Sequence, residues 1–195
     1  MISKKLINTI FVTIVVICFM LANNTNAQQK DKKPEVQVSP KASVSQIIGF
    51  TDVTINYSRP GVKGRKVWGG LVPYNVVWRT GAHEATKITF SKDVIINGSK
   101  LPAGAYAFFA IPATGEWTLI FNKVADQWGA YSYEKNKAQD ALQIKVKPVE
   151  HNFTEWLEYN FSDMDVQKAG MKNSSQVNLL WEKLRVSFKI EAETK

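Results

Sequence analysis

The sequence predicts an all-β protein, an antiparallel β-sandwich of about 9–11 strands with two long loops. Apolar and polar residues alternate with a period of two along most of the chain, which is typical of strands with one buried face. An Asn97-Gly98 pair stands between two short apolar runs, as in a tight hairpin. No segment has the pattern of an amphipathic helix longer than two turns.

The alternation of apolar and polar residues predicts where the individual strands lie. The segments that alternate are Val53–Tyr57, Ile88–Phe90, Trp117–Phe121, Leu142–Val146, Leu157–Phe161 and Leu184–Ile190. Asn97 and Gly98 lie between Val94–Ile96 and Leu101, and a type I′ turn requires positive φ at both of its central residues. Residues 94–101 are therefore expected to form a hairpin.

Residues 1–27 have the pattern of a cleaved signal peptide. Lys4 and Lys5 precede the apolar run Ile10–Ala22. Thr25-Asn26-Ala27 then supplies the small residues of a signal-peptidase cleavage site. The run has 13 residues, fewer than the roughly 20 of a membrane span, although an uncleaved anchor or a buried helix is the alternative. Residues 28–39 are polar and predict a flexible leader, so that residues 40–195 form one domain without a transmembrane span. We expect an exported protein of the periplasm, the outer-membrane surface or the medium.

Composition limits the partners. The 195 residues include 25 Lys and Arg against 17 Asp and Glu, a net charge of +8. An exported basic domain does not meet nucleic acid, so its charge favours an anionic ligand of the cell envelope or serves solubility alone. The one cysteine, Cys18, lies in the predicted signal peptide, which excludes thiol chemistry in the mature chain.

Arginine is the main candidate for a site. Three of the four arginines beyond the predicted signal peptide, Arg59, Arg65 and Arg79, fall within one segment of 21 residues, and Trp78 precedes the last of them. A guanidinium group binds carboxylate or phosphate with two parallel hydrogen bonds, which predicts an anion clamp. Alternatively, each arginine pairs internally with an acidic residue such as Glu84 or Asp52.

Two long segments do not alternate, residues 60–76 and 122–140, and long loops in a small domain are often functional. Trp128 and Tyr131 in the second loop are candidates for stacking on sugar rings, with core packing as the alternative.

Thr80, His83 and Glu84 accompany Arg79 and are also candidate ligand-binding residues. The zinc-protease pattern HExxH begins at His83 but fails at Lys87. We therefore expect neither a metal nor a cofactor.

Several short sequence motifs, in a fixed order, resemble those of a bacterial secreted family catalogued as domain of unknown function 2911. These motifs are Tyr57-Ser58-Arg59-Pro60, Lys63-Gly64-Arg65, Val77-Trp78-Arg79-Thr80-Gly81-Ala82, Glu84-Ala85-Thr86, Leu101-Pro102-Ala103-Gly104 and Phe121-Asn122-Lys123. The resemblance spans about Ser39 to Glu191 and implies export from a Gram-negative bacterium, but no activity, substrate or cofactor. The family more usually has Asn where this chain has His83, which argues against a mechanism that requires an imidazole there.

The sequence thus favours an envelope binding module for an acidic glycan, cell-wall fragment or lipid head group over an enzyme. One alternative is a glycan hydrolase or lyase that uses carboxylates such as Glu84 and Glu155 as acid and base. The other is a purely structural envelope protein in which the arginines brace the fold.

Overall fold

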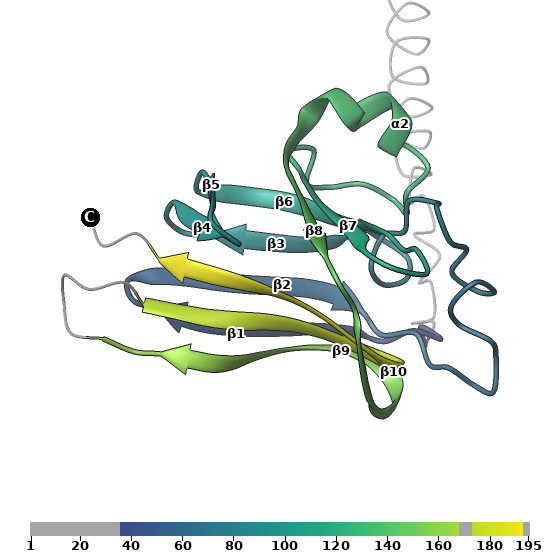
Figure 1. The fold of residues 1–195 in the computed structure, drawn as a ribbon. Helices are drawn as coiled ribbons and strands as arrows, with labels where there is room; N and C mark the ends of the chain where they lie inside the picture. The colour runs from purple at the N-terminus through teal and green to yellow at the C-terminus, as the bar shows by residue number, and fades with distance from the viewer. Residues whose placement is uncertain (1–35, 168–172, 193–195) are drawn as a thin grey trace, which may run out of the picture. The chain divides into compact units, whose positions relative to one another are not determined.

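The two sheets of the protein are built from long alternating segments and short hairpins (Figure 1). A computed structural model describes residues 36–167 and 173–192, and every element below belongs to the unit Gln37–Lys195. The predicted signal peptide and most of the predicted leader lie outside the described residues. No helix of the described part is long and apolar enough to cross a membrane.

The first sheet has six strands in the order β1-β2-β3-β6-β7-β8, all antiparallel. Their bounds are β1 Lys41–Ile48, β2 Thr51–Ser58, β3 Thr86–Phe90, β6 Gly104–Ile111, β7 Trp117–Asn122 and β8 Asp140–Val146. The second sheet has four strands in the order β5-β4-β10-β9, with β4 Val94–Ile96, β5 Ser99–Leu101, β9 Val149–Asp165 and β10 Asn173–Ala192. The ten described strands confirm the predicted antiparallel sandwich.

The hairpin at Asn97-Gly98 is also confirmed. Val94 pairs with Leu101, and φ is 45° at Asn97 and 86° at Gly98. Both central residues thus have the left-handed backbone that a type I′ turn needs.

The core lies between the two sheets and follows the predicted alternation. Phe188 of β10 packs its ring 5.5 Å from Phe108 of β6 and 5.6 Å from Phe121 of β7, so that aromatic side chains join the layers. Val53 and Ile55 of β2 are fully buried in the same cluster.

A second, smaller cluster covers the outer face of the six-stranded sheet. Phe109 points away from the main core, and Tyr133 packs against it with the ring centroids 5.3 Å apart. Tyr133 begins the short helix α2, Tyr133–Asn136, which is followed by the 3-10 turn η1, Lys137–Gln139. The second predicted loop therefore folds back over β6 and β7, and its Asp126 reaches β3, where it pairs with Lys87 at 2.8 Å.

Candidate functional site

The segment between β2 and β3, residues 59–85, lies at one end of the sandwich (Figure 1) and contributes most of the lining of a cavity of about 300 Å³. We call this space the Arg79 cavity. The basic and aromatic residues of its lining are Lys63, Arg65, Trp78, Arg79, His83 and Trp181. All but one belong to the 59–85 segment, and Trp181 comes from β10 of the other sheet.

Buried tryptophans form the inner wall of the Arg79 cavity. Trp78 is fixed to β6 by two backbone hydrogen bonds with Ala110, of 2.7 and 2.9 Å. Its ring stacks on Trp181 with the centroids 5.8 Å apart and the planes 19° from parallel. Trp68 of the first predicted loop packs edge-on against both rings, so that this loop folds inward at that residue.

Thr80 holds the backbone next to Arg79 in a strained conformation. Its φ is 52°, which a β-branched residue rarely adopts. The Thr80 hydroxyl donates to the carbonyl of Phe108, and the Thr80 carbonyl accepts hydrogen bonds from the hydroxyls of Thr86 and Tyr159. Thr80 is completely buried and is not among the residues that line the cavity, so its hydrogen bonds fix the backbone that carries Arg79.

Several nitrogens at the Arg79 cavity have no partner. Nε of Arg79, Nε2 of His83 and Nε1 of Trp181 are each buried and make no hydrogen bond within the protein. Buried polar groups are almost always hydrogen-bonded, and a group left without a partner costs about 1–3 kcal/mol. Three residues that line one cavity therefore each carry a buried nitrogen whose hydrogen-bonding capacity is unused.

The charge of the Arg79 cavity is positive. Lys63, Arg65 and Arg79 line it, whereas none of the described residues that line it is Asp or Glu. Burial lowers the pKa of Arg79, and the nearby Tyr131 hydroxyl opposes this effect. Arginine stays protonated nonetheless, so a half-buried cation lines the cavity.

The three arginines of the predicted clamp have different surroundings. Arg65 lines the Arg79 cavity beside Arg79 and is held by hydrogen bonds to the carbonyls of Val62 and Gly61. Arg59 is not part of the lining. Its Nε donates to the Leu157 carbonyl, and its guanidinium pairs at 3.3 Å with Glu158 of β9. The structure therefore brings two of the three together and uses the third to join the sheets.

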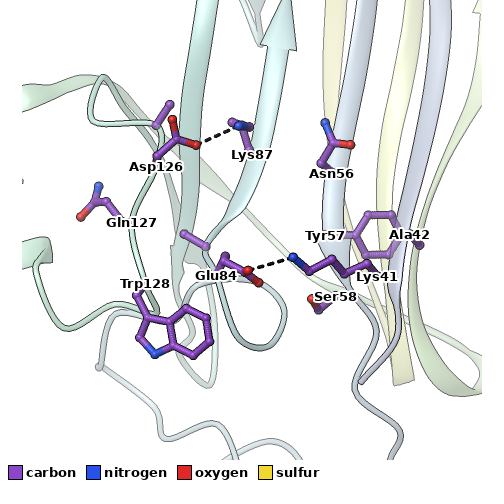
Figure 2. A pocket seen from close by; sticks show the side chains of 12 residues that line it. Lys41, Ala42, Asn56, Tyr57, Ser58, Glu84, Lys87, Asp126, Gln127 and Trp128 are labelled. Atoms are coloured by element: carbon purple, nitrogen blue, oxygen red, sulfur yellow. Dashed lines mark hydrogen bonds and ion pairs between the residues drawn. The ribbon is translucent and has the colours of Figure 1, made fainter. Parts of the chain in front are cut away.

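A second hollow, of about 450 Å³, lies next to the first on the outer face of the six-stranded sheet (Figure 2). We call it the Glu84 groove. Its polar and aromatic lining includes Lys41, Asn56, Glu84, Lys87, Asp126 and Trp128. Strands β1 to β3 supply one side, and the start of the second loop supplies the other.

The Glu84 carboxylate is held as an anion. It accepts a hydrogen bond of 2.9 Å from Lys41, and this bond is the largest of the effects that lower the pKa of Glu84. Glu84 pairs with Lys41 and with none of the arginines, so the internal Arg–Glu84 pair considered above does not form.

His83 and Glu84 form the wall between the two hollows. His83 lines the Arg79 cavity and Glu84 lines the groove. The wall is fixed to the second loop by the bridge between Glu84 and Trp128 and by a hydrogen bond of 3.0 Å from the Gly129 N–H to the His83 carbonyl. The rings of His83 and Trp128 lie 6.1 Å apart.

The aromatic residues of the second loop divide between solvent and core. The side chains of Trp128 and Tyr131 are 60% and 84% exposed, whereas Tyr133 is buried. Trp128 lines the groove, and Tyr131 lines neither hollow.

Sequence reasoning missed Lys63, Trp181, Lys41, Lys87, Asp126 and Asn56. Lys63 stands in the same Gly-rich segment as Arg65 and was accessible to the same reasoning. The others reach the hollows through strand pairing or a loop return that no local pattern encodes. Across residues 36–167 and 173–192, no three His, Cys, Asp or Glu side chains are placed to hold a metal ion.

Comparison with known proteins gives one match. No curated protein and no solved structure matches the chain significantly. A family model described as a protein of unknown function, DUF2911, matches residues 39–190, which include nearly all ten strands and the lining of both hollows apart from Val38. The chain belongs to this family of unknown function, DUF2911.

Proposed function

We propose that this protein is a binding module that takes a carboxylate or phosphate group of its ligand into the Arg79 cavity. The observation that carries the proposal is the lining of one cavity by three basic side chains, Lys63, Arg65 and Arg79, with no Asp or Glu among its described lining residues. An anionic oxygen beside the Arg79 guanidinium neutralises the cation that burial disfavours.

The surroundings support the same ligand class. Lys63 and Arg65 add positive charge to the lining, which attracts anions, and no acid of the lining competes for them. The aromatic wall of Trp78 and Trp181 lowers the local dielectric constant, which strengthens a charge-assisted hydrogen bond.

The hydrolase alternative has less support. A general acid on a glycan needs a raised pKa, whereas the hydrogen bond from Lys41 lowers the pKa of Glu84. Glu155 lines neither hollow, and its Oε1 accepts the backbone N–H of Lys63 at 2.9 Å.

Anion titrations followed by tryptophan fluorescence test the proposal, because Trp78 and Trp181 line the cavity. We expect inorganic phosphate and galacturonate to bind, and Arg79→Ala to weaken binding about tenfold or more, since a hydrogen bond to a charged group contributes about 1.5–3 kcal/mol. Arg79→Lys retains the charge without the planar fork and should recover binding only in part.

Arg185→Ala is the matched control. Arg185 is half-buried on β10, its Nε is also without a partner, and it lines neither hollow. Its loss changes the net charge equally, so binding should stay within twofold. Equal weakening by both variants would show that net charge, and not the cavity, attracts the anion.

We further propose that the protein acts outside the cytoplasm, in the cell envelope or the medium. The signal-like residues 1–27 and the charge of +8 support this location. Mass spectrometry of the protein from cell fractions tests it: an N-terminus at Gln28 in the periplasmic, outer-membrane or medium fraction is the expected result. Full-length protein confined to the cytoplasm would contradict it.

A further inference from the structure

The Glu84 groove combines an exposed indole with polar groups on a fixed backbone. Figure 2 shows the Trp128 ring beside the Glu84 carboxylate, with Lys41, Ser58 and Asn56 on the opposite side. The backbone under Trp128 is held by the hydrogen bonds from Ala85 N–H to the Gln127 carbonyl and from Gly129 N–H to the His83 carbonyl, of 2.9 and 3.0 Å. Trp128 is therefore an exposed aromatic residue on a backbone of defined position.

The charges of the groove are already paired. Lys41 binds Glu84 at 2.9 Å, and Lys87 binds Asp126 at 2.8 Å. The four side chains sum to zero charge, unlike the positive lining of the Arg79 cavity. Carboxylate oxygens and ammonium groups held in this way offer hydrogen bonds without selecting a charged partner.

These features suit a sugar ring. A pyranose has an apolar C–H face that packs on a flat indole and hydroxyl groups that both donate and accept hydrogen bonds. A peptide strand that adds to a sheet needs a free edge. Of the strands that line the groove, only β1, which carries Lys41, has one. A strand added there would lie on the far side of β1 from β2 and β3, which carry Asn56 and Lys87 and are each paired on both sides.

We propose that the Glu84 groove binds a pyranose ring on the face of Trp128, with Glu84, Asp126, Lys87 and Asn56 as partners of its hydroxyls. The groove and the Arg79 cavity share the wall of His83 and Glu84, whose Cα atoms are about 3.8 Å apart. The two hollows together therefore take an acidic oligosaccharide of at least two rings, with its acidic group at Arg79; this second part rests on the proposed function.

Calorimetric titration with two hexasaccharides tests the proposal, one acidic (hexagalacturonate) and one neutral (cellohexaose). We expect Trp128→Ala to weaken both at least tenfold, and Trp128→Phe to restore part of the loss. Arg79→Ala should weaken the acidic probe at least tenfold more than the neutral one. Phe50→Ala is the control, because Phe50 is an exposed aromatic (64%) that lines neither hollow, and it should change both affinities less than twofold.

The outcomes separate the two proposals. If Trp128→Ala leaves both affinities within twofold of the original while its melting temperature is unchanged, or if neither probe binds at millimolar concentration, the sugar site is wrong. If Trp128→Ala removes binding but Arg79→Ala acts equally on both probes, the groove stands and the anion function of the Arg79 cavity is wrong.

Discussion

At the scale of single residues, Thr80 connects the fold to the candidate site. Three hydrogen bonds hold it at a φ of 52°, next to the arginine that lines the cavity. Strain of this kind is kept only where the surrounding structure enforces it, and it is frequent at functional sites.

The strain at Thr80 is measurable by comparing two substitutions. Thr80→Ala and Thr80→Gly both remove the hydroxyl that bonds Phe108, but only glycine adopts positive φ without penalty. We expect the glycine variant to be about 1 kcal/mol more stable in urea unfolding, the reverse of the usual order. An alanine variant of equal or greater stability would show that the backbone at Thr80 is relaxed.

Tyr159 predicts a pH dependence of stability. Burial raises its pKa in the folded state, whereas the unfolded chain ionises near the ordinary value of about 10. The folded-state pKa is the higher one, so the contribution of Tyr159 is complete below about pH 10 and is lost as the pH rises toward the folded value.

Tyr159→Phe should therefore cost about 1 kcal/mol at pH 8, through loss of the hydrogen bond to the Thr80 carbonyl. One unit above the unfolded pKa, ionisation of the unfolded wild-type chain removes about 1.4 kcal/mol, so the wild type loses its advantage and the two proteins should differ by less than about 0.5 kcal/mol. Urea unfolding at pH 8 and 11 measures this, and stability curves that stay parallel would contradict the burial of the phenol.

At the scale of elements, the tight turn between β4 and β5 needs glycine at position 98 because of its backbone conformation, and not because a side chain would collide with a neighbour. Gly98 has a φ of 86°, and a Cβ there would meet no atom within 4 Å. We expect Gly98→Ala to destabilise the protein by about 1–2 kcal/mol through φ alone.

Gly115 provides the control for this prediction. A Cβ at Gly115 also has open space, but its φ lies outside the left-handed range, so Gly115→Ala should be neutral or slightly stabilising. Thermal unfolding of both variants measures the difference. Equal melting temperatures would mean that the backbone of the hairpin turn adapts to alanine.

Strand positions could be predicted because one face of each strand packs on the core. Residues 53–57 and 184–190 alternate strictly, and their apolar members are buried as expected, apart from the half-buried Leu184. The alternation does not encode partners. The alternating pattern does not predict that Trp181 of β10 packs against Trp78, because that contact arises from packing between the sheets.

At the scale of the whole molecule, the described part of the chain is a sandwich with two neighbouring hollows of different character. The Arg79 cavity is positive and has unpartnered nitrogens, whereas the charges of the Glu84 groove are paired. Arginine spacing in the sequence indicated the first hollow, since Arg65 and Arg79 both line it. The spacing could not show that Arg59 lies outside this hollow, because its partner Glu158 is 99 residues away along the chain.

The central claim is that an anion binds at Arg79. The most direct measurement is an anomalous difference map from crystals of the protein soaked in selenate, an analogue of a doubly charged oxyanion. The account predicts a selenium peak in the Arg79 cavity, with oxygens at hydrogen-bond distance from the Arg79 guanidinium group, and no such peak in crystals of Arg79→Ala. A cavity that stays empty in the wild-type crystals, or an equal peak without the guanidinium, would contradict it.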